Sequence, residues 1–230
     1  MEKIPNHIVL FPDGNRRWAK KRNLPSIRGH LEGFKNLKNL CNWCQKTGIK
    51  ILTAFGFSTE NWKRPKKEVD YLMKLFEKIL SNKKYIKELN DNEVKIKIIG
   101  QKEKLPKSLQ KVILNVENFT KKNEKFQLNL AVSYGGRWDI LQAVKKIIKR
   151  KIPLSQISEE LIGNYLSTSG LPEPDLIIRV GGEKRLSNFV LWQGAYSELY
   201  FSQKLWPDFT EKDFNKAISE YSSRQRRFGR

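Results

Sequence analysis

Residues 7–20, HIVLFPDGNRRWAK, place a short apolar run directly before a carboxylate, a glycine, an asparagine and two arginines. The apolar run at 8–11 predicts a strand that is buried on both faces. Gly14 allows backbone N–H groups to turn toward a phosphate, while Arg16 and Arg17 add positive charge. Asp13, among these cations, is expected to be ionised and able to hold a Mg²⁺ ion. An ordinary Asp-Gly turn leading into a helix explains the stretch equally well.

Apolar runs alternate with helical patterns along the whole chain. Between the runs, apolar residues at spacings of three and four predict helices, and Thr210 is the expected N-cap of the last one. The alternation predicts an α/β fold with a mostly parallel central sheet of about six strands flanked by helices. Short connections without a linker or internal repeat indicate a single domain over residues 1–230. The predicted strands are 8–11, 51–57, 94–99, 126–132, 176–180 and 198–201.

The formal net charge is +21, from 45 Lys and Arg against 24 Asp and Glu. Such a charge first suggests nucleic acid, but most lysines are spread along helical stretches. The arginines instead gather beside Gly, Asn and Ser at the ends of predicted strands, where they suit forked recognition of phosphate oxygens. The pattern favours small phosphorylated ligands or an anionic membrane surface, and we expect no nucleic-acid partner.

Hydrophobic residues make up 39% of the chain, which excludes intrinsic disorder. No apolar run approaches the roughly 18 residues of a membrane-spanning helix, and the amino terminus predicts no signal peptide. Cys41 and Cys44 form a CNWC pair, but the two histidines are distant in sequence, so a zinc site lacks ligands. The pair is better explained as two thiols on one face of a helix than as a redox or metal site. We expect a cytoplasmic protein.

Two further polar stretches follow predicted strands, where ligands bind in parallel sheets. In FSTENWKRP, residues 57–65, polar groups surround one aromatic ring; the alternative is a loop in which Trp62 covers the sheet edge. In RVGGEKRLSNF, residues 179–189, Arg179, Arg185 and Ser187 surround a glycine pair, which suits a bound diphosphate. His30 alone is expected to be structural, whereas beside an anion site it is a candidate donor.

Taken in order, HIVLFPDGNRRWAK, FGFSTENWKRP, SYGGRWD, RVGGEKRLSNFVLWQGAYSELYF, LWPDF and RQRRFG resemble the cis-prenyltransferases of the undecaprenyl diphosphate synthase type. The resemblance extends from about His7 to Gly229. It implies that family's sheet-and-helix fold, a homodimer, and Mg²⁺-dependent condensation of isopentenyl diphosphate with an allylic diphosphate such as farnesyl diphosphate. The implied product is a cis-polyprenyl diphosphate, such as an undecaprenyl-type lipid-carrier precursor. It would be handed to a membrane by an enzyme that is cytoplasmic or peripheral at the inner face.

The resemblance also implies roles for individual residues. Asp13 would assist Mg²⁺ and departure of the allylic diphosphate, Asn61 would lie near the proton lost on condensation, and Glu198 would be the second Mg²⁺ carboxylate. Arg227 would reach the isopentenyl diphosphate of the partner subunit. The other implied substrate-binding residues are Gly14, Asn15, Arg16, Arg17, Trp18 and His30 for the allylic diphosphate, Arg179, Arg185 and Ser187 for isopentenyl diphosphate, and Ser58, Glu60, Trp62 and Arg64 for placing the acceptor.

The sequence departs from the family pattern at four positions. Pro12 replaces a usual Met, Arg16 a usual Gly and Ser133 a usual Asn. Ser26 stands where an Arg normally contacts the allylic diphosphate, while Arg28 lies two residues before His30. These departures do not change the expected reaction class, but they leave the identity of the allylic substrate undetermined. The alternatives are a short-chain or irregular prenyl diphosphate synthase, or a non-catalytic partner subunit, which would typically lack Asp13.

Overall fold

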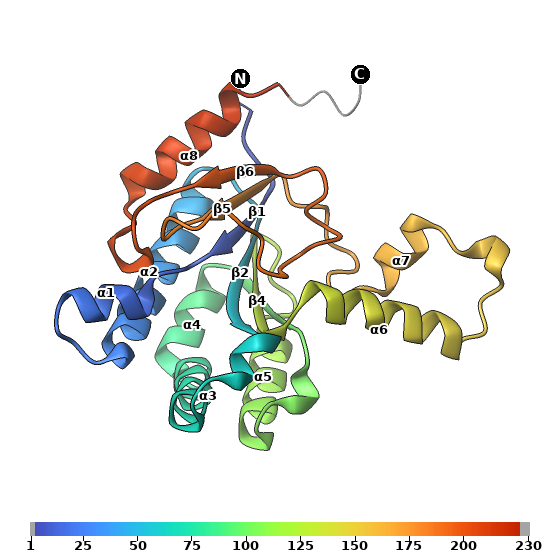
Figure 1. Ribbon diagram of the computed structural model, residues 1–230, viewed down its shortest axis with the longest axis horizontal. Coiled ribbons are helices and arrows are strands. Elements are labelled where there is room, and N and C mark those ends of the chain that lie inside the picture. The colour runs from blue at the N-terminus through green and yellow to red at the C-terminus, as the bar shows by residue number, and fades with distance from the viewer. Residues whose placement is uncertain (1–2, 226–230) are drawn as a thin grey trace. The chain divides into compact units, whose positions relative to one another are not determined.

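A computed structural model describes residues 3–225 of the chain. Its strands form a six-stranded sheet in the order β3-β4-β2-β1-β5-β6 (Figure 1). The pairs β1–β2, β1–β5, β3–β4 and β5–β6 are parallel, which confirms the predicted fold class. Each predicted strand is present, within two residues of its expected ends. The strands are β1 (His7–Phe11), β2 (Ile51–Ser58), β3 (Val94–Ile99), β4 (Phe126–Tyr134), β5 (Leu176–Arg179) and β6 (Glu198–Phe201).

Five of the helices follow the predicted apolar stripes, and Thr210 caps the last of them by accepting a hydrogen bond from the Asp213 N–H. Three short helices, α1, α4 and α7, were not separately predicted. The break before α4 has a local cause, because the Asn82 side chain accepts from the Tyr85 N–H and starts a new helix there. The α-helices are α1 (Asn15–Lys21), α2 (Ser26–Lys46), α3 (Lys66–Leu80), α4 (Lys83–Asp91), α5 (Lys107–Thr120), α6 (Gly136–Lys149), α7 (Glu159–Tyr165) and α8 (Glu211–Ser223).

The chain divides into two compact units, and β2 passes from the first into the second. The first unit comprises residues 1–54, 173–185 and 196–230; the second comprises residues 55–172 and 186–195. The single-domain expectation stays a prediction. The first unit holds β1, β5, β6, α1, α2 and α8, and the second holds β3, β4 and α3 to α7.

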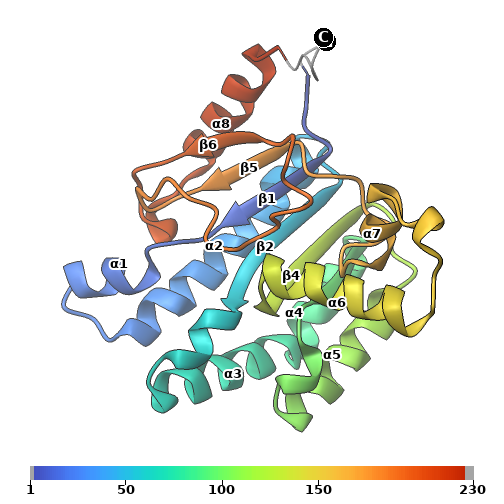
Figure 2. The same ribbon diagram turned by 45° about the vertical axis from the view of Figure 1, so that its right-hand side comes forward.

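The core of the first unit is built on β1. Ile8, Val9 and Leu10 are each 0% exposed, and because successive side chains of a strand alternate, both faces of β1 are covered. Phe11 pairs with Arg179, so the loops that follow β1 and β5 start side by side. Figure 2 shows the arrowheads of these two strands pointing the same way. The register therefore delivers two predicted site segments to one place.

The core of the second unit is built on β4, whose residues are buried except for Gln127. The Phe189 ring stacks on Phe55, with 4.1 Å between ring centroids, and meets Tyr134 edge-on at 5.4 Å. These aromatic contacts join the segment 186–195 to β2 and β4. The predicted site stretches FSTENWKRP and SYGGRWD both begin at the ends of these strands.

Candidate active site

Asp13 follows β1, and its carboxylate lies between two arginines of the first unit. Arg179 Nη2 is 3.1 Å from Asp13 Oδ2, and Arg17 Nη2 is 3.4 Å from Asp13 Oδ1. Arg179, the last residue of β5, is only 5% exposed, and its guanidinium lies 4.9 Å from the centroid of the Phe11 ring. A guanidinium buried to this extent requires anionic or carbonyl partners. Asp13 is the anion, and the Arg185 carbonyl accepts a second hydrogen bond from Arg179.

The ion pairs continue from Arg17 through Glu183 to Arg185. Arg17 Nη1 is 3.6 Å from Glu183 Oε1, and Arg185 Nη1 is 2.6 Å from Glu183 Oε2. The cluster thus holds three arginines and two carboxylates, and the side chains of Arg17 and Arg185 are 45% and 61% exposed. Exposed ion pairs contribute little to stability, so phosphate oxygens can replace the carboxylates as partners of Arg17 and Arg185 at small cost. This arrangement could accept an anion beside the carboxylate of Asp13.

Two glycines allow the backbone of these loops to come close together. Gly14 has a φ of 102°, and a Cβ added there would lie 2.7 Å from a Leu205 side-chain carbon. Gly181 has a φ of 90°, and its added Cβ would lie 2.8 Å from Arg17 Nη2. Both conformations favour glycine, and neither position has room for a side chain. The prediction that Gly14 lets backbone N–H groups turn toward a phosphate stays a prediction.

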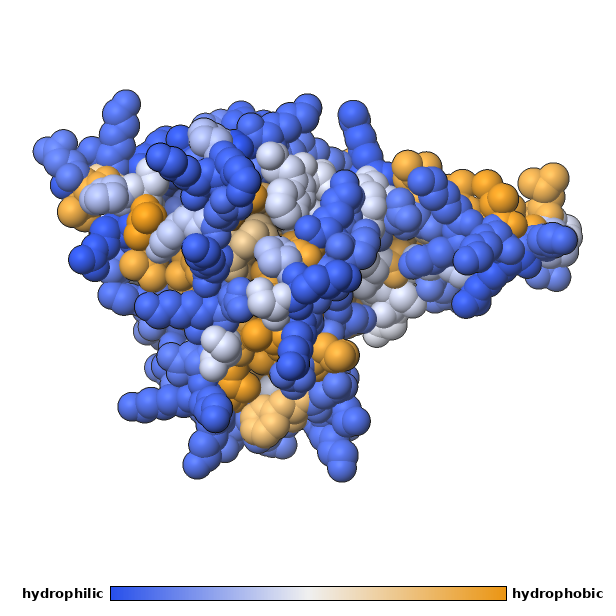
Figure 3. All heavy atoms as spheres, turned by 90° about the horizontal axis from the view of Figure 1, so that it is seen from below, coloured by the Kyte–Doolittle hydropathy of each residue, from blue (hydrophilic) through white to orange (hydrophobic). Residues whose placement is uncertain are grey.

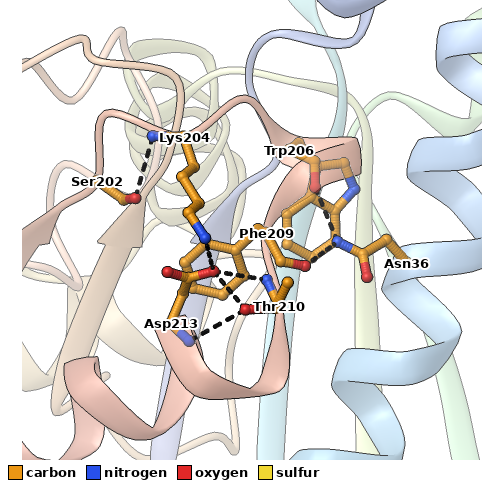
Figure 4. Close-up of polar contacts among 7 residues, drawn as sticks. All are labelled: Asn36, Ser202, Lys204, Trp206, Phe209, Thr210 and Asp213. Carbon is orange, nitrogen blue, oxygen red and sulfur yellow. Dashed lines mark hydrogen bonds and ion pairs between the residues drawn. The ribbon is translucent and has the colours of Figure 1, made fainter.

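The segment after β6 holds the backbone of Asp13 in place. The Trp206 N–H donates to the Asp13 carbonyl at 2.9 Å. The buried Asn36 amide of α2 donates to the carbonyls of Trp206 and Phe209, at 2.7 and 2.8 Å. Figure 4 shows this amide reaching the turn from α2, with Asp213 joined to Thr210 on the other side. The LWPDF sequence therefore fixes the position of Asp13 relative to α2.

The residues of α1 and α2 have mixed environments. The Trp18 indole N–H donates to Asp208 at 2.7 Å, so this side chain ties α1 to the LWPDF turn. Arg16 is exposed, and His30 is half-buried on α2. A Cβ added at Gly29 would lie 2.0 Å from the Asn15 carbonyl oxygen, so the two helices are in close contact beside His30.

Glu198 lies at the other end of the sheet from Asp13. It begins β6 opposite Leu176, three residues before the pair formed by Arg179 and Phe201, which corresponds to roughly 10 Å along the strand. Its carboxylate pairs with Arg224, at 2.8 Å. Burial lowers the pKa of Arg224, but hydrogen bonds to Glu198 and Glu220 raise it overall. Within one chain, Glu198 therefore does not lie beside Asp13. Arg227, the other residue expected to complete the site, lies outside the described residues.

The second unit holds the turn Ser58–Arg64. Ser58 Oγ accepts from the Asn61 N–H, and Asn61 Oδ1 accepts from the Ser58 N–H, at 3.2 and 3.1 Å. The Trp62 indole N–H donates to Ser133 Oγ at 2.8 Å, and Arg64 Nη1 donates to Glu68 at 3.0 Å. The turn is therefore fixed by its own capping box and by the end of β4. The alternative, in which Trp62 covers the sheet edge, accounts for the edge-on contact between the Trp62 and Phe57 rings. It does not account for the hydrogen bond from Trp62 to Ser133.

Two residues of this region were missed by sequence reasoning. Ser133 was noted only as a departure from a usual Asn, yet it has a φ of 54° and accepts the Trp62 hydrogen bond. Asn188 was not singled out at all, yet its Nδ2 donates to Glu60 Oε1 at 2.7 Å. Partial burial raises the pKa of Glu60, but hydrogen bonds, led by that from Asn188, lower it overall. The sequence signal that could have identified Asn188 is its position directly after the candidate ligand Ser187 in RLSNF.

The two cysteines are structural. Cys41 and Cys44 are buried on α2, and burial raises the pKa of Cys41 to about 12. Burial and the neighbouring Cys41 also raise the pKa of Cys44. Both thiols are therefore protonated and unreactive at neutral pH, as expected for core residues.

The family is decided by comparison with known proteins. A family model described as "Putative undecaprenyl diphosphate synthase" matches residues 11–229. The chain belongs to the cis-prenyltransferase family. It is 50% identical to the isoprenyl transferase of Thermotoga maritima, over 99% of this chain and 97% of that protein. The isoprenyl transferase of Neisseria meningitidis is 48% identical, over 99% of this chain and 90% of that protein. The chain is therefore a prenyltransferase, as its motifs indicated.

Solved structures of cis-prenyltransferases give the same result for the fold. A lavandulyl diphosphate synthase from Lavandula x intermedia, solved in complex with dimethylallyl diphosphate, is 39% identical, with a TM-score of 0.93 and 99% of each chain covered. A "probable undecaprenyl diphosphate synthase" from Campylobacter jejuni is 36% identical, with a TM-score of 0.83 and 100% of each chain covered. Within residues 3–225, none of the helices has the length and apolar character needed to cross a bilayer.

We predict that Ser133→Ala lowers the free energy of unfolding by about 1 kcal/mol, because the half-buried Trp62 N–H loses its acceptor. Urea denaturation measures this change, and acrylamide quenching of Trp fluorescence should increase. Ser133→Asn keeps an acceptor and suits the positive φ, so it should retain stability. Ser81→Ala, at an exposed helix end, is the control and should change stability by less than ~0.5 kcal/mol. Equal effects of all three variants would contradict the role of Ser133.

Proposed function

We propose that the enzyme condenses isopentenyl diphosphate with an allylic diphosphate, such as farnesyl diphosphate, to give a cis-polyprenyl diphosphate. The observation that carries the proposal is the ion-pair cluster around Asp13, with its excess of arginine. Two diphosphates carry several negative charges, and arginine forks match their oxygens. Asp13 with the α1 residues is assigned to the allylic diphosphate, and Arg179, Arg185 and Ser187 to isopentenyl diphosphate.

The reaction builds negative charge on the leaving diphosphate. The bond between the allylic C1 and the diphosphate oxygen breaks, and the oxygen keeps the electron pair. The allylic carbon then forms a new bond to the terminal carbon of isopentenyl diphosphate, and a proton leaves C2 as the cis double bond forms. Fixed cations such as Arg17 stabilise the leaving group as its charge grows. Asn61, whose Oδ1 is held by the Ser58 N–H, presents its amide beside the acceptor.

Asp13 fits a Mg²⁺ site of the kind completed by substrate. Its side chain is 38% exposed, and Mg²⁺ is commonly held by one or two carboxylates together with substrate phosphates. Bound Mg²⁺ would neutralise charge on the departing diphosphate. Glu198 cannot join Asp13 within one chain, so its proposed metal role requires a second copy.

We propose that this second copy forms a homodimer through α6. Leu141, Val144 and Ile148 recur at spacings of three and four and are 50%, 39% and 69% exposed. Figure 3 shows hydrophobic surface along the part of the molecule that carries α6 and α7, among largely hydrophilic surroundings. A stripe of this kind is typical of a helix that is covered in an assembly. With a charge of +21 on each chain, the dimer would release its product at the inner face of an anionic membrane.

A short-chain or irregular synthase remains the second candidate, because the lavender relative solved with dimethylallyl diphosphate makes lavandulyl diphosphate by its title. Products formed with dimethylallyl, geranyl, farnesyl and geranylgeranyl diphosphate as starters separate the two. A ladder of products from farnesyl diphosphate supports the polyprenyl synthase. A single ten-carbon product formed from dimethylallyl diphosphate supports the alternative. Absence of turnover with every starter supports a non-catalytic partner subunit.

Asp13→Asn should lower turnover of radiolabelled isopentenyl diphosphate by several orders of magnitude. It should keep the secondary structure seen by circular dichroism, with a lower free energy of unfolding because Arg179 loses its anion. The amide keeps the shape of the side chain but loses the charge that the metal and Arg179 need. Asp70→Asn, at an exposed i,i+4 pair on α3, is the control and should keep full activity. Asp13→Asn activity above about a tenth of wild type, a barrier change of only ~1.4 kcal/mol, would contradict the assignment.

Gly56→Leu should shorten the products and spare the first condensation. Gly56 is exposed on β2, two residues before Ser58, and a Cβ added there would lie 3.2 Å from both the Ala131 carbonyl oxygen and the Phe76 ring. A larger side chain therefore projects where we expect the growing chain to lie. Thin-layer chromatography of the products measures the change, with Gly163→Leu as the control because an added Cβ there meets nothing within 4 Å. An unchanged product ladder would place the growing chain elsewhere.

Mixing inactive Asp13→Ala chains with inactive Arg227→Ala chains should restore turnover. In a heterodimer, one site keeps Asp13 and receives the intact tail of the other chain. Random pairing makes half of the dimers mixed, so about a quarter of wild-type activity is expected. Two affinity tags verify that heterodimers form. Verified heterodimers without turnover would mean that Arg227 acts within its own chain.

A further inference from the structure

We propose that Asn188 is a positioning residue, which holds the turn Ser58–Arg64 in the conformation that receives isopentenyl diphosphate. The role of the turn itself is part of the proposed function, and the proposal adds the residue that fixes it. Asn188 follows Ser187 directly and lies in the same unit as the turn. One residue therefore connects a candidate diphosphate ligand with the candidate acceptor turn.

Asn188 makes three hydrogen bonds with two other segments. Its Nδ2 donates to Glu60 Oε1 at 2.7 Å, and its Oδ1 accepts from the Arg137 N–H at 2.9 Å. Its backbone carbonyl accepts from the Gly136 N–H at 2.6 Å. The side chain thus uses both ends of its amide, one on the start of α6 and one on the turn. A residue with only a donor or only an acceptor cannot replace it.

The amide fits between the two segments without spare room. A Cβ added at Gly135 would lie 2.8 Å from Asn188 Nδ2 and 2.5 Å from Thr59 Oγ1. The start of α6, the Asn188 amide and the turn are therefore in direct contact. A change in the length or charge of the side chain at position 188 therefore acts directly on the contact with the turn.

The backbone around Asn188 is held in a conformation that most residues avoid. Ser187, Asn188 and Val190 have φ values of 44°, 62° and 41°, and for a β-branched residue such as Val190 this is a rare conformation. Asn is among the residues that adopt it most readily. Stacking of Phe189 on Phe55 and the hydrogen bond from Gln193 to Thr168 (2.8 Å) hold the segment in place. Backbone strain of this kind clusters at functional sites, where the surroundings fix it.

Glu60 is the part of the turn that responds to Asn188. The hydrogen bond from Asn188 leads those that lower the pKa of Glu60, so the acceptor is a carboxylate near neutral pH. Glu60 is exposed, and such bonds add little to overall stability. Together with the capping box and the Trp62–Ser133 hydrogen bond, this bond sets the position of the turn, and with it Asn61 and Trp62.

The test exchanges the hydrogen-bond donor and acceptor between Asn188 and Glu60. Asn188→Asp keeps the size, the acceptor for Arg137 and the ability to adopt positive φ, but places a second carboxylate against Glu60. We expect the KM for isopentenyl diphosphate to rise roughly tenfold or more, with a smaller change in the KM for farnesyl diphosphate. The double variant Glu60→Gln with Asn188→Asp restores a donor opposite an acceptor, so Asn188→Asp should raise the KM much less in a Glu60→Gln background than in wild type. Asn23→Asp, at an exposed residue with a φ of 55°, is the matched control and should have no effect.

A pH profile gives a signature that a merely structural role would not produce. In Asn188→Asp, repulsion between the two carboxylates raises the pKa of the pair, and a single shared proton rebuilds the hydrogen bond. The defect relative to wild type should therefore shrink as the pH falls and grow as it rises. The double variant has only one carboxylate at this place. The ratio of its KM for isopentenyl diphosphate to that of wild type should therefore not change with pH.

Hydrogen exchange without substrate separates this proposal from the proposed function. Exchange of amides in a peptide covering residues 58–64 should be faster in Asn188→Asp than in wild type or the double variant. Unchanged exchange, or an unchanged KM for isopentenyl diphosphate despite faster exchange, overturns the proposal, as does failure of the double variant to recover. If Asn188→Asp does not fold, Asn188→Gly removes the side chain while allowing positive φ, and the same exchange criterion applies. Wild-type enzyme without turnover would overturn the proposed function instead.

Discussion

The rest of the first unit depends on the pairing of Arg179 with Asp13. Parallel register places a buried guanidinium at the end of β5, next to the end of β1, and a buried cation must meet an anion. That requirement determines where the loop after β1 turns. It also accounts for glycine at position 181, where a side chain would collide with Arg17. The folded chain therefore already holds a carboxylate at the place where we propose that the diphosphate and Mg²⁺ bind.

Much of this could be predicted from the sequence because it depends on local patterns. Apolar runs give the strands, stripes at spacings of three and four give the long helices, and the strand-end rule gives the position of the Asp13 site. Short polar helices such as α1 have no such pattern, since four of its seven residues are arginine or lysine and leave no apolar stripe. The Asp13–Arg179 contact needed the strand order, which no local pattern contains. The same is true of Glu198, whose distance from Asp13 follows only from the register of β6 on β5.

The residues that sequence reasoning missed share one physical character. Ser133 and Asn188 are small polar residues with positive φ, and each satisfies a group from a distant segment. Their side chains would be unremarkable in any loop, so only tertiary contact distinguishes them. Arg17 and Arg185 could be named in advance because arginines beside a glycine turn at a strand end suit phosphate oxygens. The contacts that hold a polar turn in place are thus harder to predict than charged candidate ligands.

The burial of both cysteines has a practical consequence for following the enzyme in solution. The sequence contains two cysteines, and both are enclosed in the core with raised thiol pKa values. Maleimide reagents, which react with accessible thiolates, will therefore leave the native protein unlabelled. A cysteine introduced at the exposed Lys63 would be the one reactive position on the turn Ser58–Arg64. A fluorophore attached there could report on the turn in real time without a cysteine-free background having to be engineered first.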